Sequence, residues 1–509
     1  MKQDIARQLA EGNRQIRRRL VRAQKRRHGR GQPVLSASNV TYEVSDRVRA
    51  ISHGGLAAIH RIVLQSGLVQ RIDEQVHVLK VHQPYHESDH VLNIAYNVLC
   101  GGRTLEDIEI RRNDAAFLDA MGVDAIPDPT TAGDFCRRFQ ESDILALQTA
   151  INETRVSVWS RQDPNFFSRA RIDSDGTLVP TTGECKEGMD IAYDGTWGYH
   201  PLVVSLANTA EPLFIVNRSG NRTSSEGAAG YLDRAISLCR KAGFQRVLLR
   251  GDTDFSQTTH LDRWDADGVC FVFGYDARKN MKAQADDLGA ESYGELERRA
   301  KRAFVEQDKQ RARQPRVKDA IVRKRGFKTI RLRSEDIAEF AYQPIACTKP
   351  YRMVVVRKNL SVTQGENLLF DNIRYFFYIT NDPDFTAAEV VFEANDRCDQ
   401  ENLIAQLKGG VRALHAPVNT LNANGAYMVM AALAWTLKAW MALSLPISDR
   451  WRAKHEGDRR RWLRMDFHTF RKAVIDVPAQ ILTSGRRRIW RLLAWRPELP
   501  VFFRLVDST

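Results

Sequence analysis

The chain has 509 residues, which is long enough for two to four domains and at least one large hydrophobic core. Its 76 Lys and Arg residues exceed its 62 Asp and Glu residues, and the net charge of +14 favours a polyanionic partner, in the first place nucleic acid. The seven scattered cysteines include no Cys-x-x-Cys pair, which indicates reduced thiols rather than a zinc site or a disulfide framework. No stretch approaches the ~20 uninterrupted apolar residues that cross a bilayer, and the chain starts without the apolar core of a secretory signal. We therefore expect a cytoplasmic protein with no membrane segment.

Residues 13–31 form a dense basic segment without an acidic residue. Ile16, Leu20 and Ala23 recur at steps of four and three, which predicts a basic helix with a thin apolar stripe. Because so many like charges repel one another unless they meet anions, we interpret the segment as an arm that contacts DNA. A solvated, partly disordered tail is the alternative. The arm residues expected to bind DNA are Arg17, Arg18, Arg19, Lys25, Arg26 and Arg27.

From residue 46 to residue 155, apolar residues recur at three- and four-residue steps, which predicts helices. A segment with two prolines and two threonines at 127–135 marks a stop and a restart in this pattern. With the basic arm, residues 1–160 are predicted to form a helical N-terminal region. The pattern identifies no particular helix-turn-helix motif.

After Pro164 the pattern changes from helical to mixed. Strands are predicted at residues 170–175, 200–208, 213–216, 246–250 and 269–274, with a helix at 227–242 and another near Gln257. Strands first in series and then alternating with helices describe a mixed α/β sheet. We assign residues 161–280 to the first part of a core whose element order is compatible with an RNase H-like fold and with several other α/β folds.

A basic insertion interrupts this core. Residues 295–334 carry fifteen basic and five acidic residues, and strand-like runs follow at 351–356 and 374–380. A helix is expected to begin near Thr386. The predicted division is an inserted, β-rich and basic domain at 281–370, a second core segment at 371–445 and a basic, Trp- and Arg-rich helical region at 446–509.

The C-terminal part of the chain contains an apolar run and several Arg clusters. The apolar run at 426–440 contains many small residues, so we expect a core helix rather than a membrane span. Three Arg clusters follow, Arg450-Trp-Arg, Arg459-Arg-Arg-Trp-Leu-Arg and Arg486-Arg-Arg-Ile-Trp-Arg. They either line a phosphate path or form exposed helix faces whose Trp residues point inward. The sequence favours neither interpretation.

Three acidic residues on separate segments carry the chemical prediction. Asp175 and Asp252 each follow apolar residues and lie beside Gly, where a short side chain at a strand end can reach a metal ion. Glu401 is expected on a helix together with Arg397 and Lys408, all within roughly 40° of one another around the helix axis. Carboxylates gathered from different elements can hold two Mg²⁺ ions on a phosphodiester.

Each aspartate belongs to an Asp-x-Asp pair, so Asp173 and Asp254 compete for the same roles. We prefer Asp175 because Asp-Gly-Thr ends the strand, and Asp252 because it comes directly after Leu-Leu-Arg-Gly. Asp173 and Asp175 point to the same face of a strand, so spacing alone does not separate them.

The order of these acidic and basic residues along the chain resembles that of the DDE transposases of bacterial insertion sequences. The matching parts are Asp175-Gly-Thr, the turn Arg250-Gly-Asp252, a long insertion and the spacing Arg397-x3-Glu401-x6-Lys408. Among these enzymes the chain is most similar to the 1380 group, of the superfamily with a Tyr-Arg-Glu-Lys signature. The resemblance covers residues 164–410, with a looser match on either side.

The resemblance implies that Asp175, Asp252 and Glu401 bind two Mg²⁺ ions, which Mn²⁺ can replace, and that Arg397 and Lys408 hold phosphates of the element's end. It implies an RNase H-like catalytic core and cut-and-paste transposition through metal-dependent hydrolysis and strand transfer. The implied partners are double-stranded DNA, as terminal inverted repeats and as target, and a second copy of the chain in a homodimer that joins two ends. The helical N-terminal region and the insertion would recognise the ends of the element. The resemblance does not decide whether a DNA hairpin forms as an intermediate.

The sequence departs from this family in two places. Ala394 stands where the signature has Tyr, so the phosphate contact of that Tyr is absent or is supplied elsewhere. The insertion also lacks the Trp that traps a flipped base in some relatives, which leaves Tyr342, Tyr351 and Phe327 as open substitutes.

Two alternatives stay open. Residues 173–177, Asp-Ser-Asp-Gly-Thr, also resemble the nucleophile loop of haloacid dehalogenase-like phosphatases, in which one Asp is phosphorylated and the second protonates the leaving group. That interpretation leaves the basic charge and the helix with Glu401 unexplained. The other alternative is a catalytically inactive, transposase-derived DNA-binding protein, against which the presence of all three carboxylates argues.

Overall fold

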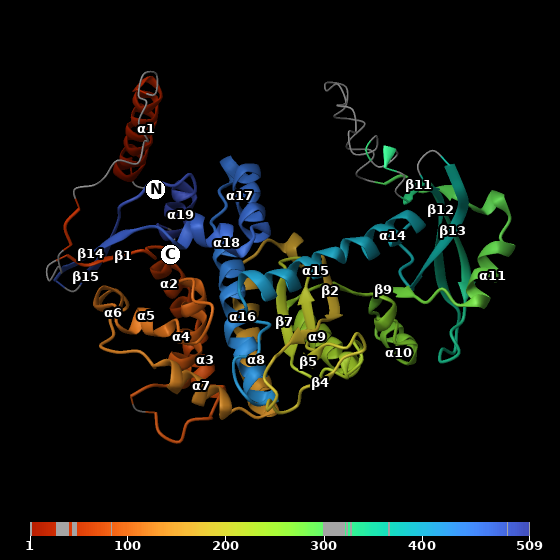
Figure 1. The fold of residues 1–509 in the computed structure, drawn as a ribbon, viewed down its shortest axis with the longest axis horizontal. Coiled ribbons are helices and arrows are strands. Elements are labelled where there is room, and N and C mark those ends of the chain that lie inside the picture. The colour runs from red at the N-terminus through yellow and green to blue at the C-terminus, as the bar shows by residue number, and fades with distance from the viewer. Residues whose placement is uncertain are drawn as a thin grey trace.

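The computed structural model describes residues 3–26, 40–42, 48–82, 84–298, 321, 324–325, 328–364, 367–485 and 487–507. Helices make up most of the N-terminal part (Figure 1). They are α1 (Gln3–Arg26), α2 (Leu56–Ser66), α3 (Leu68–Gln75), α4 (Glu87–Leu99), α5 (Ile108–Arg112), α6 (Ala115–Met121), α7 (Pro129–Arg137) and α8 (Glu141–Trp159). The helices predicted between residues 46 and 155 are therefore confirmed.

The N-terminal helices share one hydrophobic core with the C-terminal half of the chain. α16 (Leu421–Leu443) lies in this core and packs against α4, α7 and α8. It is long and apolar enough to cross a membrane, but the residues of its apolar stretch are all buried inside the protein, as expected for a core helix. A buried carboxylate ties the parts together, because Glu211 accepts hydrogen bonds from Arg155 of α8 (3.0 Å) and from the Trp440 indole of α16 (2.9 Å).

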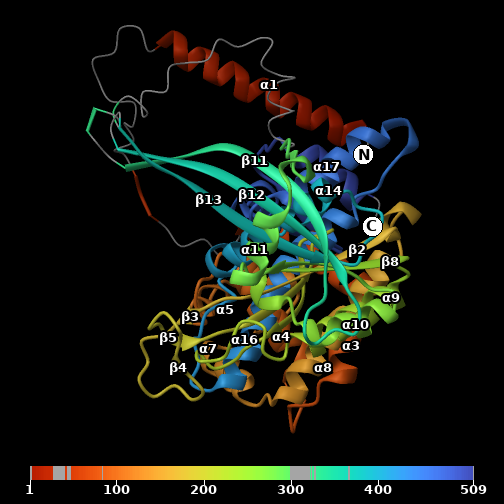
Figure 2. The same cartoon turned by 90° about the vertical axis from the view of Figure 1, so that its right-hand side faces the viewer.

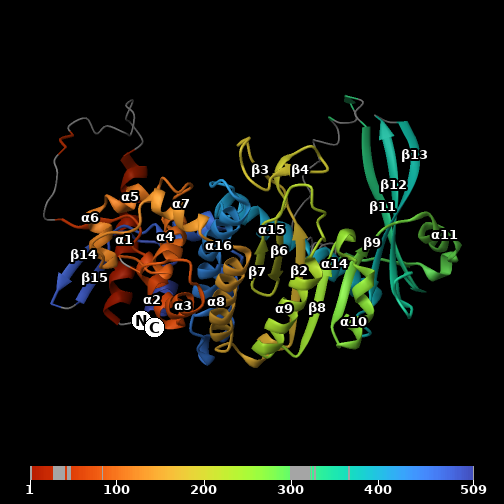
Figure 3. The same ribbon diagram turned by 90° about the horizontal axis from the view of Figure 1, so that it is seen from below.

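A nine-stranded mixed sheet lies beside these helices (Figure 3), with the strand order β10-β11-β12-β13-β9-β8-β2-β6-β7. β2 pairs antiparallel with β6 and parallel with β8, which in turn pairs parallel with β9. The bounds are β2 (Arg169–Gly176), β6 (Leu202–Leu206), β7 (Glu211–Val216), β8 (Arg246–Gly251), β9 (Cys270–Tyr275), β10 (Gly294–Glu295), β11 (Lys328–Tyr342), β12 (Tyr351–Gln364) and β13 (Asn367–Thr380). The predicted mixed sheet is confirmed. A small sheet of β3 (Val179–Pro180), β5 (Trp197–Tyr199) and β4 (Asp190–Ile191) lies between β2 and β6 in the chain.

The strands of the predicted insertion prolong this sheet. β13 pairs antiparallel with β9, with Phe377 opposite Tyr275 and Thr380 opposite Val272. The predicted boundary between residues 370 and 371 falls inside β13 and is corrected, because this strand pairs with β12 on both sides of the boundary, with one register shift between Phe370 and Leu368. Figure 2 shows that β11, β12 and β13 extend well beyond the rest of the sheet. The basic segment 299–320 and Phe327 lie outside the described residues.

Alternation along the strands sends side chains to opposite faces of the sheet. Leu249 and Phe271 join the main core, on the face covered by α9 (Ala228–Ala242). Leu248 and Val272 join a smaller apolar cluster on the other face, which α14 (Ala387–Asp396) covers. Two shorter helices, α10 (Leu261–Ala266) and α11 (Lys279–Asp287), flank β9 in the chain.

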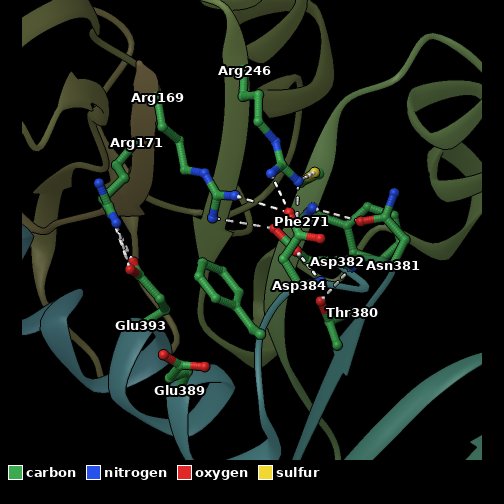
Figure 4. A network of polar contacts seen from close by, with 12 residues as sticks. Arg169, Arg171, Arg246, Phe271, Thr380, Asn381, Asp382, Asp384, Glu389 and Glu393 are labelled. Atoms are coloured by element: carbon green, nitrogen blue, oxygen red, sulfur yellow. Dashed lines mark hydrogen bonds and ion pairs between the residues drawn. The ribbon is translucent and has the colours of Figure 1, made fainter. Parts of the chain in front are cut away.

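Polar contacts fix the segment that returns from β13 to the beginnings of β2 and β8 (Figure 4). Asp382, which is buried, lies 3.2 Å from Arg169 and 3.7 Å from Arg246. Arg171 of β2 binds Glu393 of α14 through contacts of 2.7 and 2.9 Å. These charged contacts hold α14 in one position against the sheet, and with it the residues that follow.

α14 begins where the sequence predicts. Thr386 is its N-cap, and Thr386 and Glu389 form a reciprocal capping box in which each side chain accepts from the main chain of the other. α15 (Cys398–Ala405) follows after a single junction residue.

The C-terminal region differs from the predicted helical domain. It contains α17 (Arg452–Arg464), α18 (Phe467–Phe470) and α19 (Leu499–Val506), but also a hairpin of β14 (Ala479–Ser484) and β15 (Arg487–Leu492), and β14 pairs with β1 (Ala50–Ile51). The last Arg cluster is a strand because Trp490 and Leu492 pack against the core and alternate with exposed residues, which is the two-residue period of a sheet.

Candidate active site

The two predicted aspartates come from the ends of neighbouring parallel strands. Asp175 is the penultimate residue of β2, and Asp252 directly follows β8. β2 and β8 pair with Asp173 opposite Arg250, and the same register places Asp175 level with Asp252. Asp252 is held by a local turn in which its carboxylate accepts from the main-chain N–H of Asp254 at 3.0 Å.

The surroundings of both carboxyls disfavour the charged form. Burial raises the pKa of Asp175 to about 6; Arg397 opposes this rise, and the carboxylates of Asp252 and Glu401 add to it. Burial also raises the pKa of Asp252, again against Arg397. Carboxyl groups with raised pKa values at one edge of a sheet are typical of a functional site.

α15 is docked on the sheet by its buried residue Gln400. The Gln400 amide donates to the Val203 carbonyl at 3.0 Å, and its oxygen accepts from the Ser205 hydroxyl, both on β6. Because Gln400 faces the sheet, its neighbour Glu401 projects outward, and 61% of the Glu401 side chain is exposed.

Arg397 lies between the first and the third predicted carboxylates. It is the residue between α14, which ends at Asp396, and α15, which begins at Cys398. Its Nη1 lies 3.3 Å from Oδ2 of Asp175, and its Nη2 lies 3.6 Å from Oε1 of Glu401. The guanidinium group thus links residues that are more than two hundred positions apart in the chain.

The segment with Arg397, Glu401 and Lys408 is not the single regular helix that the spacing argument assumed. It breaks at Arg397, and a π-helical turn at Gln406–Gly410 contains Lys408. Burial lowers the pKa of Lys408, and the nearby Asp175 carboxylate opposes this shift. The Asp175 carboxylate is therefore one of the charges that act on the Lys408 amine. π-helical turns are frequent at functional sites.

Asp173, the rival of Asp175, has a different environment. It is fully buried and accepts from Arg250 Nε (2.7 Å) and Nη2 (2.8 Å), while Arg250 also contacts Glu393 at 3.1 Å. A carboxylate held in this way is inaccessible to a substrate. The arrangement therefore disfavours the phosphatase interpretation, which needs a reachable nucleophile at this loop. Asp254, the rival of Asp252, is exposed.

Two further predictions concern residues away from the centre. Ala394, at the position of the signature's Tyr, packs against the apolar cluster under α14. Tyr351 is buried and donates to Asp262 at 2.6 Å, and the Tyr342 ring packs edge-on against Tyr275 at 5.5 Å. Tyr351 is therefore unsuited to trap a flipped base, and Tyr342, which is half-buried, stays an open candidate.

The basic arm is largely α1. This helix starts at Gln3, ten residues before the predicted segment, and Arg17, Arg18 and Arg19 are exposed on it. The apolar stripe is also exposed, at 41% for Ile16 and 59% for Leu20. The side chains of Lys25 and Arg26, and Arg27 as a whole, lie outside the described residues.

Comparison with known proteins decides the family. The model of the family "Transposase DDE domain group 1" matches residues 33–508, which is nearly the whole chain. The chain belongs to this family of DDE transposases. A DDE transposase domain implies an enzyme that cleaves DNA and transfers its strands. One solved structure, of a piggyBac transposase synaptic complex with hairpin DNA, is similar at 10% identity and a TM-score of 0.38, over 83% of this chain and 82% of that chain. A search of curated proteins finds no match.

DDE transposases generally use divalent metal ions, and the donor types of this transposase fit such ions. Asp175, Asp252 and Glu401 supply hard carboxylate oxygens from three elements. Burial is the main cause of the raised pKa values of both aspartates, and neighbouring carboxylates add to it against the opposing charge of Arg397. In the described part of the chain, no group of three or more His, Cys, Asp or Glu is close enough to hold one ion. Arg397 occupies the space between Asp175 and Glu401, so a shared ion requires this side chain to move.

His200 is a neighbour of the site that the sequence argument missed. It is buried, and its Nδ1–H donates to the Arg222 carbonyl at 2.7 Å. A Cβ atom at Gly176 would lie 2.7 Å from His200 Nε2, so only glycine fits next to Asp175. The one signal in the sequence was a histidine at the start of the segment that pairs with β2.

Proposed function

We propose that this transposase cuts phosphodiesters at the ends of an insertion sequence of the 1380 group and joins the freed 3′ ends to target DNA. The single observation that supports this most is the level placement of Asp175 and Asp252 at one sheet edge, with Glu401 linked to Asp175 through Arg397. The strand order β7-β6-β2-β8-β9, with β2 antiparallel to β6 and parallel to β8, supports an RNase H-like core for this activity.

The proposed roles follow from how each side chain is held. A pair of Mg²⁺ ions on these carboxylates would activate the attacking oxygen and stabilise the leaving oxygen. The main-chain ladder of β2 and β8 fixes Asp175, and a local turn fixes Asp252, so both present oxygens with little loss of conformational freedom. Glu401 is exposed on a docked helix, and Arg397 contacts both its carboxylate and that of Asp175.

Arg397 and Lys408 have a role that complements that of the three carboxylates. Arg397 and Lys408 carry positive charge beside the carboxylates, where phosphates of the element's end would lie. Positioning and charge stabilisation of this kind require no covalent nucleophile from the protein. Two ends must be held together for transposition, so we include a homodimer on double-stranded DNA in the proposal.

Cleavage of DNA that contains the inverted repeats flanking the coding region tests this function. We expect Asp175→Asn, Asp252→Asn and Glu401→Gln each to abolish cleavage in Mg²⁺ while binding of the same duplex, measured by fluorescence anisotropy, stays within about twofold. Asp254→Asn is the matched control, because this exposed carboxyl is two residues from Asp252 and should be dispensable.

The outcomes separate the remaining possibilities. Normal cleavage by Glu401→Gln would show that the proposed site is wrong. Binding of the duplex without cleavage by the unmodified protein, in Mg²⁺ and in Mn²⁺, would favour the catalytically inactive DNA-binding protein.

A further inference from the structure

α17 turns two chemically different faces to the protein and to solvent. Trp462 is fully buried against the Phe470 ring, and His455 accepts from the main-chain N–H of Ser448 at 3.1 Å. Arg459 lies on the same inner side and donates to Gln162 at 2.8 Å. For this Arg cluster, the structure therefore places the Trp inside, as in one of the two interpretations that the sequence left open.

The outer face of α17 carries exposed basic side chains and two small residues. Its cations are exposed and lie within about 120° around the helix axis, with two small residues between them. We define the α17 basic face as Ala453, Lys454, Gly457, Arg460, Arg461 and Arg464.

Contacts within the protein do not account for these charges. The carboxylates that pair with Arg460 and Arg461 are 3.9 and 3.7 Å away, and Lys454 and Arg464 form no ion pair with the part of the chain that the structure describes. Arg460 and Arg464 are four residues apart on one helix face, where like charges repel. The helix dipole favours cations in the last turn but disfavours Lys454 in the first.

Gly457 is also unexplained by packing. A Cβ atom at this position would meet nothing within 4 Å, so the fold does not require glycine there. Glycine inside a helix costs about 1 kcal/mol relative to alanine. A small residue flanked by cations allows the sugar–phosphate backbone of DNA to approach the helix closely.

We propose that the α17 basic face binds the backbone of double-stranded DNA, as a surface additional to Arg397, Lys408 and α1. The proposal rests on the proposed function, because it assumes that the transposase acts on a DNA duplex. α17 and α1 both lie on the upper side of the molecule in Figure 1, so we expect one duplex along this side to contact both helices. α9 lies on the opposite side and faces the viewer in Figure 3.

The test measures binding of the full chain to a 30-base-pair duplex of random sequence. We expect Arg460→Ala/Arg461→Ala/Arg464→Ala to weaken binding at least about tenfold and to reduce the slope of log K against log salt by about 0.9 for each phosphate that the variant no longer neutralises. Arg234→Ala/Arg240→Ala/Lys241→Ala on α9 removes the same charge from the opposite side and should change affinity by less than about twofold.

Two further variants keep the test independent of folding and of charge. Gly457→Leu adds bulk at a position where a Cβ atom meets nothing within 4 Å and replaces a residue that disfavours the helix, so we expect an equal or higher melting temperature together with weaker DNA binding. Arg460→Lys/Arg461→Lys/Arg464→Lys keeps the charges and should retain most of the affinity.

The outcomes distinguish this inference from the function on which it rests. If the unmodified protein binds the duplex and the α17 triple variant binds it with the same affinity and salt slope, the inference is wrong and the proposed function stands. An equal loss in the α9 variant would also contradict it, because net charge alone would then explain the effect. If the unmodified protein binds no duplex, the proposed function itself fails.

Discussion

Nη1 of Arg397 lies 3.3 Å from Oδ2 of Asp175, although the two residues are 222 positions apart in the chain. Its Nη2 lies 3.6 Å from Glu401, so one guanidinium group balances part of the charge of two predicted metal ligands. In the absence of DNA, we therefore expect this side chain and a divalent ion to compete for the same carboxylates.

The first prediction follows from this competition. Without DNA, Arg397→Gln should bind Mn²⁺ about tenfold more tightly than the unmodified protein, because the competing charge near the carboxylates is gone. Isothermal titration calorimetry measures this affinity, and Arg397→Lys, which keeps a charge, should fall in between. Cleavage by Arg397→Gln should nevertheless be lost, since its proposed phosphate contact is removed. Unchanged or weaker Mn²⁺ binding in Arg397→Gln would contradict the competition, and Asp175→Asn should show whether the ion binds at this site at all.

The second prediction concerns Asp173, whose role is to anchor Arg250. Asp173→Asn should lower the free energy of unfolding by roughly 3 kcal/mol, because it removes one partner of a buried ion pair and leaves Arg250 with Glu393 alone. Chemical denaturation monitored by circular dichroism checks this. The residual folded protein should still cleave, and a stable but inactive Asp173→Asn variant would instead assign catalysis to this residue.

The third prediction is that Asp175→Asn stabilises the fold, whereas Asp173→Asn destabilises it. Its pKa of about 6 in the folded protein exceeds the ordinary value of 3.8, so the folded state binds this proton more tightly. The resulting stabilisation is complete below about pH 3.8 and is lost as the pH rises through about 6. Asp175→Asn should therefore gain stability relative to the unmodified protein by up to about 1.4 kcal/mol per pH unit across this window and level off above it. A difference in melting temperature that is flat between pH 4 and pH 7 would contradict the raised pKa.

The sequence predicted those parts of the site that depend on local order. Asp175 and Asp252 end strands, and Thr386 caps a helix, because turn and cap chemistry depends on residues that are adjacent in the chain. Spacing alone did not separate Asp173 from Asp175, because the two differ in a long-range contact: Asp173 binds Arg250, which also binds Glu393, 220 positions away from Asp173. Spacing along one strand carries no information about a partner on a distant helix.

Two other features depend on competition between local and long-range forces. The regular helix assumed from Arg397 to Lys408 breaks at Arg397 and widens into a π-helical turn, because docking of Gln400 and burial of Leu407 override the regular period. The predicted insertion boundary fell inside β13 because strand length is set by pairing with β12 along the whole strand, and sequence periodicity does not reveal the partner.

The last prediction concerns Lys438, which couples α16 to the end of α17. Its amine donates to the Leu463 carbonyl at 2.8 Å and lies 3.7 Å from the centre of the Trp435 ring, and burial lowers its pKa to about 7. Between about pH 7 and the ordinary value of 10.5, the unfolded chain binds a proton that the folded chain does not, so lowering the pH through this window destabilises the fold. Lys438→Met should gain stability relative to the unmodified protein as the pH falls from 10 to 7, by up to about 1.4 kcal/mol per pH unit. Denaturation at each pH measures this, with the exposed Lys454→Met as the control that should show no such trend. If Lys438→Met instead loses stability steadily toward pH 7, the amine is charged in the folded state and its hydrogen bond is an ionic one.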